Sequence, residues 1–530
     1  GAIDITGNLD LNAAITSATS IRVSGTSDLG ANVTTSGTQT YSGATTLSAA
    51  ITLSASDINI NNNVTTSSGD ILMRASGTFT IASTKAITNS SSNTIITAAR
   101  FVNNSTSAAL SNTGASKYWQ VWSTNADPYN VSTGDTVGSL PYDYKQYNAT
   151  YGSTVVQGGT GKGLLYSYAP TLTFSLTGTP SKVYDGSTTA TLASNHYAVS
   201  GAVDSDVITY NKPTSGTYDN KNVGTSKTIT ATSVTLTSVA SSTAKPVYGY
   251  GVTATTITGN IGEITRATAN VSATKTYSGD TALTSGQVTI TGVTVSSNTE
   301  VLTYTGTATL SDANVATSNK YVVPTSMTLA NGGSEATTGL ASNYNLPSNA
   351  YNATSNRATV NAAPLTVTAD NQITTYGTVI STGTGKTTFT RSGLLGSDAI
   401  SSVTLATTQT ETTNAGSSGI TITPSAATGA SFTASNYSIT YATGSVTINK
   451  APLGINVSGT YSGSTSLSAP TLGTVTGLMN SETLTSLTSA TLNSKDVANN
   501  STNYVTAIVK NAGSADTDTN YQITAARNNT

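Results

Sequence analysis

The stretch Lys182-Val183-Tyr184-Asp185-Gly186 decides how the second half of the sequence folds, because variants of it return three times. The tyrosines at the centre of these stretches lie 93, 99 and 85 residues apart. A motif that recurs at such a period indicates a tandem structural repeat. The three variants are Lys275-Thr276-Tyr277-Ser278-Gly279, Thr375-Tyr376-Gly377 and Thr460-Tyr461-Ser462-Gly463.

Two further landmarks keep register with these opening tyrosines, Tyr184, Tyr277, Tyr376 and Tyr461. The second landmark lies 35 to 38 residues later and comprises Asn222-Val223-Gly224, Asn314-Val315-Ala316, Asn414-Ala415-Gly416 and Asp496-Val497-Ala498. The third follows 23 to 30 residues after that and comprises Tyr250, Asn343-Tyr344, Asn436-Tyr437 and Asn520-Tyr521. The sequence therefore predicts four copies of one module, called repeats 1 to 4: residues 169–267, 268–364, 365–452 and 453–530.

Each repeat consists of short alternating strands with Gly, Asn and Asp turns, which is typical of an Ig-like β-sandwich. The seams contain Ala169-Pro170, Arg266-Ala267, Ala363-Pro364 and Ala451-Pro452. Seams this short leave little room for a hinge, so we expect an elongated rod. The opening tyrosine is expected to bury its ring between the sheets and to bond nearby backbone through its hydroxyl, as a tyrosine corner does.

Residues 1–115 have a different texture, with short strand-like pieces such as Ile58–Ile60 and Ile71–Met73 separated by small polar residues. Coils of roughly 20 residues with this pattern favour a right-handed parallel β-helix over an ordinary sandwich sheet. Asn61, Asn62 and Asn63 suit a corner of such a solenoid, because asparagine tolerates left-handed backbone and can stack its amides. The overall prediction is an all-β chain in which a β-solenoid shaft precedes the sandwich repeats.

Residues 116–168 hold both tryptophans and eight tyrosines, and we expect them to form a cap or linker that closes the end of the shaft. The alternative is an exposed aromatic platform that binds glycans. The residues proposed for that platform are Trp119, Trp122, Tyr142 and Tyr144.

Composition excludes several kinds of chemistry. The chain has no Cys and one His, so it offers no Cys/His metal site and no thiol nucleophile, and no cofactor is expected. Its net charge of −2 without basic runs argues against nucleic acid as a partner. Asp204 and Asp206 stand close together, but nothing nominates them as a glycosidase pair. No apolar run is long enough for a transmembrane helix, and the expectation is a protein that is not an enzyme.

With these motifs quoted, the chain resembles the large bacterial exoproteins of the two-partner secretion, filamentous-haemagglutinin-like class. Lys182–Gly186 looks like the name-giving motif of a YDG repeat, and the stretches at Lys275 and Thr460 look like variants with Ser in place of Asp. Residues 365–450 look more like an MBG-type repeat. The secretion-directing N-terminal domain of that class is not recognisable, so residue 1 is expected to lie inside a larger product.

The resemblance implies export through an outer-membrane partner to the surface of a Gram-negative bacterium, and it brings no catalytic residues. The expected function is that of a secreted structural protein, either an elongated adhesin or a subunit of a cell-surface or biofilm-matrix filament. Its expected partners are further copies of itself, in fibres, or surface glycans. A carbohydrate-binding protein and a polysaccharide-degrading β-helix enzyme remain alternatives, although residues 1–115 are poor in the charged groups that the enzyme needs.

Overall fold

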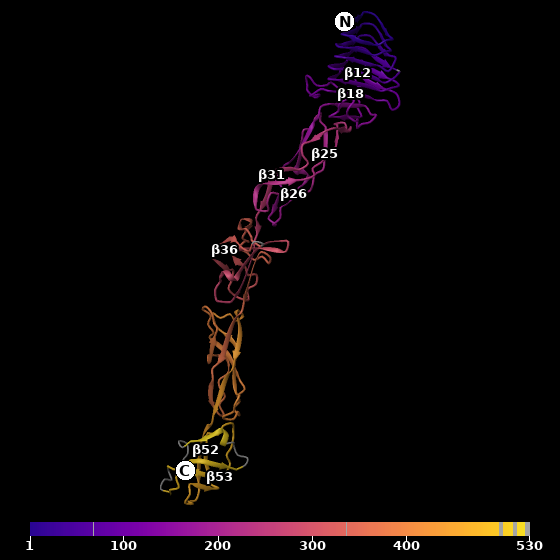
Figure 1. The fold of residues 1–530 in the computed structure, drawn as a ribbon. Helices are drawn as coiled ribbons and strands as arrows, with labels where there is room; N and C mark the ends of the chain where they lie inside the picture. Colours follow the sequence, from indigo (N-terminus) through magenta and orange to yellow (C-terminus); the bar gives the residue numbers. More distant parts are fainter. Residues whose placement is uncertain (67, 335–336, 498–501, 512–516, 525–530) are drawn as a thin grey trace. The chain divides into compact units, whose positions relative to one another are not determined.

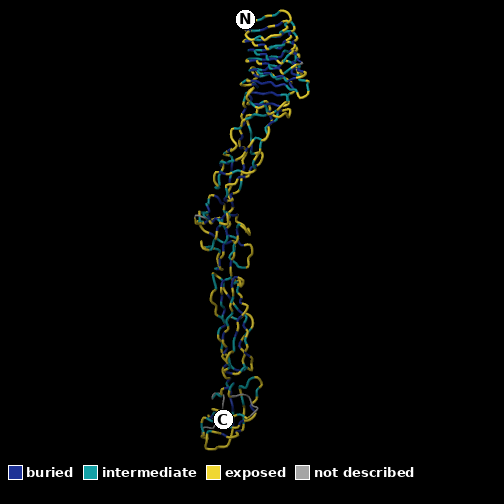
Figure 2. Tube along the Cα trace, turned by 45° about the vertical axis from the view of Figure 1, so that its right-hand side comes forward, coloured by how far each residue is buried: buried dark blue, intermediate teal, exposed yellow. Residues whose placement is uncertain are grey.

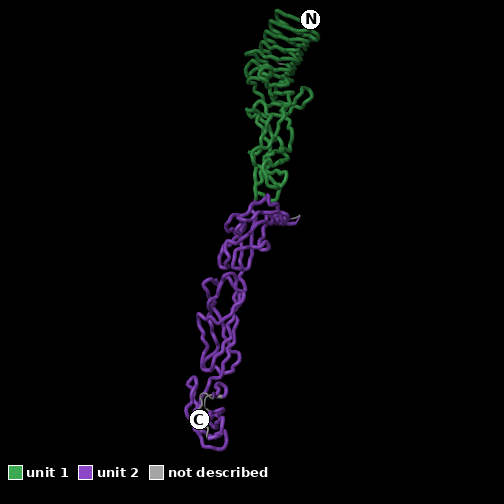
Figure 3. Tube along the Cα trace, turned by 90° about the vertical axis from the view of Figure 1, so that its left-hand side faces the viewer, with its two compact units in different colours: residues 1–266 green, residues 267–530 purple. Residues whose placement is uncertain are grey.

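The structure is a computed structural model that describes residues 1–66, 68–334, 337–497, 502–511 and 517–524 (Figure 1). Nearly all of its regular structure is β-strand, so the prediction of an all-β chain is confirmed. The chain divides into two compact units, Gly1–Arg266 and Ala267–Thr530 (Figure 3). No helix in the described residues is long and apolar enough to cross a membrane.

The first part of unit 1 winds through three parallel sheets, and each turn of the chain adds one strand to each sheet. The first sheet contains β1 (Ala2–Ile5), β4 (Ser20–Val23), β7 (Gln39–Tyr41), β10 (Ile58–Ile60), β13 (Thr78–Ile81) and β16 (Arg100–Asn103). The second contains β17 (Leu110–Asn112), β14 (Ile87–Asn89), β11 (Val64–Thr66), β8 (Thr45–Leu47), β5 (Ser27–Leu29) and β2 (Leu9–Leu11). The third contains β29 (Val247–Tyr248), β19 (Tyr144–Gln146), β20 (Gly163–Tyr166), β18 (Trp119–Ser123), β15 (Thr94–Ala98), β12 (Ile71–Ala75), β9 (Thr52–Ala55), β6 (Val33–Thr35) and β3 (Ile15–Ala18).

Strand register explains how the core of this region can be built from few types of side chain. Ile3 pairs with Ile21, and Phe79 pairs with Phe101, so like residues stack on like from one turn to the next. Aliphatic and polar residues alternate, and the aliphatic ones face the interior (Figure 2). The Phe79 and Phe101 rings are fully buried and stacked, with centroids 6.1 Å apart.

Asparagine side chains at the corners accept hydrogen bonds from the backbone of the next turn of the chain. The Oδ1 atom of Asn32 accepts a hydrogen bond of 2.7 Å from the N–H of Thr52, and that of Asn63 accepts one of 3.1 Å from Ala86. Residues 61–63 lie at a corner between β10 and β11, as expected, but none of them adopts a positive φ. Their contribution is therefore side-chain bonding to the backbone and not left-handed geometry.

Residues 116–168 continue the third sheet through β18, β20 and β19, and β29 from repeat 1 pairs with β19. Trp119, Tyr147 and Tyr166 join the buried core of the coiled region, and so do Val239 and Val247 of repeat 1. The coiled region, the aromatic segment and repeat 1 thus share one hydrophobic core within unit 1.

Repeat 1 continues in three small sheets. The first has β24 (Tyr197–Ser200), β21 (Thr171–Leu176) and β30 (Gly251–Val252), and the short 3-10 turn η1 (Ser194–His196) precedes β24. The second has β22 (Ser181–Val183), β31 (Ile257–Thr265), β27 (Gly224–Ala231), β26 (Ser215–Tyr218) and β23 (Thr189–Thr191). The third pairs β25 (Val207–Tyr210) with β28 (Leu236–Ala240).

Unit 2 contains repeats 2 to 4, each built from small, mostly antiparallel sheets. Each of these repeats begins in a strand that starts one or two residues before the predicted bound, at Ala267, Ala363 and Ala451. The first sheet of repeat 2 pairs β32 (Ala267–Thr268) with β40 (Tyr344–Asn345). The second contains β39 (Met327–Asn331), β36 (Asn298–Gly306), β35 (Val288–Val295), β33 (Asn270–Thr276) and β41 (Asn356–Asn361). The third contains β34 (Ala282–Leu283), β37 (Ala308–Leu310) and β38 (Val322–Val323), and the repeat also has the turns η2 (Ser285–Gln287) and η3 (Ala341–Asn343). Repeat 3 has β45 (Phe389–Ser392), β42 (Ala363–Ala369) and β48 (Tyr437–Ala442); β43 (Gln372–Thr375), β49 (Gly444–Asn449), β47 (Thr421–Thr428), β46 (Ser402–Thr407) and β44 (Gly383–Lys386); and η4 (Ala434–Asn436). Repeat 4 has β52 (Thr471–Thr476), β50 (Ala451–Ser458) and β55 (Tyr521–Ile523); β51 (Ser466–Ser468), β53 (Leu487–Leu492) and β54 (Val505–Lys510); and one helical turn, α1 (Thr517–Asn520).

Repeats 1 to 3 each end in a strand that lies parallel to the segment before the opening tyrosine, and we call β31, β41 and β49 the closing strands. Their buried apolar residues include Ile264, Val360 and Ile448. One residue separates β41 from β42, and one, Lys450, separates β49 from β50. Within unit 2, the last strand of one repeat thus leads directly into the first strand of the next.

Candidate functional site: tyrosine–carboxylate joints

The opening tyrosine of repeat 2 contacts repeat 3. The hydroxyl of Tyr277 donates a hydrogen bond of 3.0 Å to Oδ2 of Asp398, and the hydroxyl of Tyr437 donates one of 2.8 Å to the same oxygen. The two rings meet edge to face, with centroids 5.4 Å apart at 75°. One carboxylate therefore joins the first landmark of one repeat to the third landmark of the next.

The same arrangement recurs between repeats 3 and 4. Tyr376 donates to Oε1 of Glu482, and Tyr521 donates to Oε2 of that residue over 2.7 Å. The two rings again lie 5.4 Å apart at 75°. Asp and Glu both fill the acceptor position, so the carboxylate and not the length of the side chain is the common requirement.

The second landmark completes each joint. The side chain of Asn436 accepts from the N–H of Val315 and donates to Oδ1 of Asn314, both over 2.8 Å. Asn520 repeats both bonds in the next joint: it accepts from the N–H of Ala415 over 2.9 Å and donates to Asn414 over 3.0 Å. All three landmarks of the sequence repeat thus meet at each of the two boundaries between repeats in unit 2.

The glycine after the opening tyrosine lets the neighbouring repeat approach closely. Gly279 and Gly377 both have positive φ, which only glycine adopts without strain. A Cβ atom added to Gly377 would lie 2.5 Å from the side chain of Met479, and one added to Gly279 would lie 3.0 Å from the Cα of Gly396. Positive φ and the close approach of the next repeat together favour glycine at these two positions.

A third joint, within unit 1, links the aromatic segment to repeat 1. Tyr147 and Tyr250 donate to Oδ2 of Asp206 over 2.9 and 3.0 Å, and their rings lie 5.0 Å apart at 78°. This joint also contains a cation: the fully buried Lys145 bonds Oδ1 of Asp206 at 2.5 Å and Oδ2 of Asp204 at 2.8 Å. No role for Asp204 and Asp206 could be predicted from the sequence. In the structure they are the counter-ions of the buried Lys145.

The third-landmark tyrosines have a constant environment in all four repeats. Each hydroxyl also accepts a backbone N–H, from Val203, Val293, Leu395 and Met479 in repeats 1 to 4. Tyr344 of repeat 2 donates to Glu300 over 2.7 Å, which extends the pairing of tyrosine with carboxylate to every repeat.

Burial and the carboxylates make these tyrosines hard to ionise. Burial, with Asp398 as a smaller cause, raises the pKa of Tyr437 to about 12. The pKa of Tyr277 rises for the same two reasons. Both hydroxyls therefore stay protonated, and able to donate, through the neutral pH range.

The predicted role of the opening tyrosine needs correction. Tyr184, Tyr277 and Tyr376 are buried as expected, but the hydroxyls of Tyr277 and Tyr376 donate to carboxylates of the following repeat, where bonds to nearby backbone were expected. Tyr461 differs from all three, because 62 % of it is exposed. The carboxylates themselves were missed, although an acidic residue stands 39 or 44 residues before each third-landmark tyrosine.

The lysine of the opening motif organises the loop that follows it. Lys182 bonds Asp185 at 2.7 Å and the carbonyl of Ser187 at 2.8 Å. Lys275 bonds Asp280 at 2.7 Å and the carbonyl of Ala282 at 2.6 Å. The motif aspartate Asp185 is thus a loop anchor.

The predicted glycan platform is wrong in its main residues. Trp119, Trp122 and Tyr144 are 0 %, 4 % and 2 % exposed, and Tyr142 is half-buried. The indole N–H of Trp122 donates to Gln120, and Gln120 donates to the hydroxyl of Tyr144, so these rings belong to the core. These aromatic residues lie on strands that continue a sheet of the coiled region. Their rings fill the interior because each buries a large apolar area there.

An open pocket of about 670 Å³ does lie in the aromatic segment, next to Tyr142. Tyr129 and Tyr166 add further rings to it, and its polar lining includes Asp143, Lys162, Asp204 and Lys245. Among the described residues, no group of three or more His, Asp or Glu side chains could hold a metal ion.

Two segments match known domain families. Residues 168–245 match the YDG domain, and residues 365–447 match the MBG domain of the YGX type. No curated protein and no solved structure matches the chain. The expectations of a YDG repeat around Tyr184 and an MBG repeat from residue 365 are therefore confirmed. Both domain types are typical of surface or extracellular proteins, so the chain is similar to surface-associated repeat proteins.

Proposed function

We propose that this chain is a non-enzymatic structural protein of the bacterial exterior, either an adhesin or a subunit of a cell-surface or biofilm-matrix filament. The observation that carries the proposal is the recurring joint, in which a tyrosine of one segment binds a carboxylate of the next. A joint made of an edge-to-face contact between two rings and several side-chain hydrogen bonds resists bending and pulling better than a flexible linker. A protein that holds its domains in fixed succession suits a mechanical task.

The proposed architecture is a right-handed parallel β-helix followed by four Ig-like sandwiches in an elongated rod. The three parallel sheets of residues 2–123 support the first part, and the recurrent small sheets of the repeats support the second. Single-residue connections at the seams within unit 2 support the rod. Export through an outer-membrane partner, in the manner of two-partner secretion by a Gram-negative bacterium, completes the proposal and rests on the resemblance and on the matched domains.

Negative-stain electron microscopy of the purified chain tests the mechanical proposal. We expect rods of uniform width, and bent or kinked particles for the double variant Asp398→Ala/Glu482→Ala, which removes two joint carboxylates. The matched control is Asp127→Ala, a change at an exposed carboxylate outside the joints. Compact particles for the parent chain would refute the rod. Gold-labelled antibody on intact cells tests the location, and label confined to the cell interior would refute the surface role.

A second candidate function is glycan binding, in the pocket of about 670 Å³ and not on the tryptophans. A pocket that combines tyrosine faces with carboxylate and ammonium groups offers both stacking and hydrogen bonds to a sugar. A glycan array with the parent chain and the Tyr142→Ala variant tests this, with Tyr351→Ala as the control at an exposed tyrosine in repeat 2. Glycan signal that Tyr142→Ala abolishes supports this function, and signal unchanged by that substitution excludes the pocket.

A further inference from the structure

Lys145 and Asp206 in unit 1 form an ion pair in which both side chains are shielded from solvent. Lys145 lies in β19 of the aromatic segment, and Asp206 directly precedes β25 of repeat 1. The Nζ atom of Lys145 lies 2.5 Å from Oδ1 of Asp206, and the two side chains are 1 % and 0 % exposed. An amino group and a carboxyl group from two segments of the chain are thus held in contact away from water.

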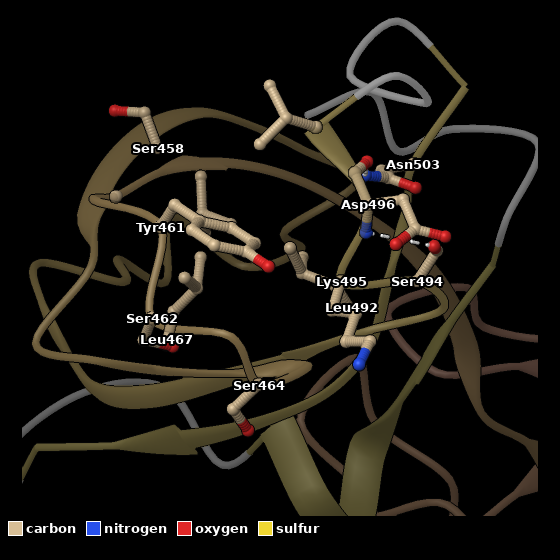
Figure 4. Close-up of a pocket in the computed structure, with 13 residues that line it drawn as sticks. Ser458, Tyr461, Ser462, Ser464, Leu467, Leu492, Ser494, Lys495, Asp496 and Asn503 are labelled. Carbon is tan, nitrogen blue, oxygen red and sulfur yellow. Dashed lines mark hydrogen bonds between the residues drawn. The ribbon is translucent and has the colours of Figure 1, made fainter.

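Other lysines and aspartates that lie close together in the chain remain open to water. In three further ion pairs the lysine is buried but the aspartate side chain is not: Lys227 with Asp219 (42 % exposed), Lys275 with Asp280 (60 %) and Lys320 with Asp312 (33 %). In repeat 4, Lys495 and Asp496 line a pocket of about 420 Å³, and both are exposed (Figure 4). Burial of both partners sets Lys145 and Asp206 apart from these pairs.

Burial makes the ionic form of the pair costly. Two charges that leave water lose hydration, and their mutual attraction restores it only in part. Burial raises the pKa of the Asp206 carboxyl, against the opposing effects of Lys145, Tyr147 and Tyr250. It therefore favours transfer of a proton from Lys145 to Asp206, which gives the amine and the carboxylic acid that condense to an amide. Because water is the other product of that condensation, a site that excludes water also favours the amide.

The groups around Asp206 are placed to assist such a condensation. Tyr147 and Tyr250 donate to Oδ2 of Asp206 over 2.9 and 3.0 Å, so they stabilise the negative charge that this oxygen gains when an amine attacks Cγ. Oδ2 of Asp204 lies 2.8 Å from Nζ of Lys145, where it can accept a proton from the nitrogen. Asp204 also lines the pocket of about 670 Å³, into which a released water molecule can leave.

We propose that Lys145 and Asp206 condense to an intramolecular amide, so that a covalent bond ties the aromatic segment to repeat 1. One proton moves from Nζ to Oδ1, the amine attacks Cγ, and the new C–N bond replaces the bond from Cγ to Oδ1. A second proton passes from the nitrogen through Asp204 to the departing oxygen, which leaves as water. The ammonium and the carboxylate supply all the atoms of the amide and the water, so the step needs no oxidant and no co-reactant. Oδ2 becomes the amide oxygen and keeps its bonds from Tyr147 and Tyr250.

Mass spectrometry of the purified full chain tests the proposal. Under denaturing conditions, we expect an intact mass that is lower than the sequence mass by one water molecule. A succinimide formed at an aspartate loses the same mass, so the cross-linked peptides must also be identified. After digestion with trypsin, residues 118–162 should remain uncut after Lys145 and be joined to residues 183–221, and fragmentation should place the link between Lys145 and Asp206.

Variants of the chain identify the reacting groups. Lys145→Arg keeps the positive charge but cannot form the amide, because a guanidinium stays protonated, and its mass should equal the sequence mass. The matched control Lys245→Arg, at an exposed lysine, should lose one water as the parent does. Asp204→Asn removes the proton acceptor and leaves Asp206 in place, and it should lower the cross-linked fraction by about tenfold or more.

An intact mass equal to the sequence mass in the parent chain would overturn the proposal, and so would tryptic cleavage after Lys145 or a link that ends at Asp204. These measurements on the parent do not depend on whether a variant folds. Complete cross-linking of Asp204→Asn would overturn the role of Asp204 as proton acceptor. None of these results bears on the surface location or on the shape of the particles, so the inference and the proposed function fail separately.

Discussion

The hydroxyl of Tyr277 lies 3.0 Å from Oδ2 of Asp398, 121 residues further along the chain and in the next repeat. The sequence period made Tyr277 visible, and only the folded chain shows that its partner is an acid outside its own repeat. A residue that recurs once in each module can thus serve the boundary between modules and not the core of each.

Removing the Tyr277 hydroxyl is expected to weaken the joint between repeats 2 and 3. Tyr277→Phe keeps the ring contact with Tyr437 and loses one hydrogen bond to a charged acceptor, which costs about 1.5–3 kcal/mol. Urea denaturation of the full chain measures the loss. Tyr351→Phe, at an exposed tyrosine in the same repeat, serves as the control and should change stability by less than about 0.5 kcal/mol. Equal effects of the two substitutions would contradict the role of the hydroxyl.

Asp398 accepts from two hydroxyls, so its removal should be more harmful than the loss of either donor. Asp398→Ala leaves the hydroxyls of Tyr277 and Tyr437 without their shared acceptor. In a double-mutant cycle, Tyr277→Phe and Asp398→Ala should couple by about 0.5–3 kcal/mol, whereas Tyr376→Phe and Asp398→Ala, in different joints, should add independently. Full additivity of the first pair would show that the contact contributes nothing.

The buried ion pair of unit 1 predicts a large effect for a single charge. Lys145→Met leaves Asp206 buried without its cation, and breaking such a pair costs about 3–5 kcal/mol. Lys245→Met, at an exposed lysine, is the matched control and should be nearly neutral. Thermal melting monitored by circular dichroism compares the two variants. A melting temperature for Lys145→Met equal to that of the control would mean that Asp206 is satisfied by other groups.

Alkaline pH should loosen the joints of unit 2. Burial and Asp398 raise the pKa of Tyr437 from 10.0 to about 12, so folding favours its neutral form. The stability that this group contributes is complete below pH 10 and is lost as the pH rises toward 12. Urea denaturation at intervals from pH 9 to 12 should show stability falling across that window, with a shallower fall for Tyr437→Phe. Identical pH profiles for parent and variant would contradict the shift.

Replacing a buried tryptophan should lower the stability of unit 1, whereas replacing a residue of a glycan platform would lower glycan binding. Trp122 is 4 % exposed, so Trp122→Ala should destabilise unit 1 by about 3–5 kcal/mol. Tyr151→Ala, at the partly exposed ring that meets Trp122 edge to face, should cost much less. Thermal melting measures both losses. A Trp122→Ala chain with unchanged melting but altered glycan binding would restore the platform.

The all-β composition and the repeats could be predicted from the sequence because both depend on local patterns. Alternation of aliphatic with small polar residues, as in Ile58–Ile60, specifies a strand without reference to its partner. The landmarks could be found because they recur. Two segments of the predicted repeats, residues 168–245 and 365–447, match known domains.

The joints could not be predicted in the same way, because their partners come from different repeats. Nothing near Glu482 in sequence distinguishes it from an exposed acid, and its role appears only when Tyr376 approaches it from the preceding repeat. The prediction of a glycan platform in the aromatic segment is wrong for a related reason. Residues that bind sugars and residues that fill a core have the same chemistry, and only burial separates Trp119 from a platform.

Within unit 2, each joint between repeats takes a tyrosine from near the start of one repeat and a carboxylate from about the middle of the next. A whole repeat of unit 2 that is duplicated or deleted by recombination therefore leaves the joints within unit 2 matched. Gain or loss of part of a repeat would leave a tyrosine or a carboxylate at one boundary without its partner. Evolution can change the number of domains in such a chain without inventing a new interface, and the period of the gene sets the unit in which its length varies.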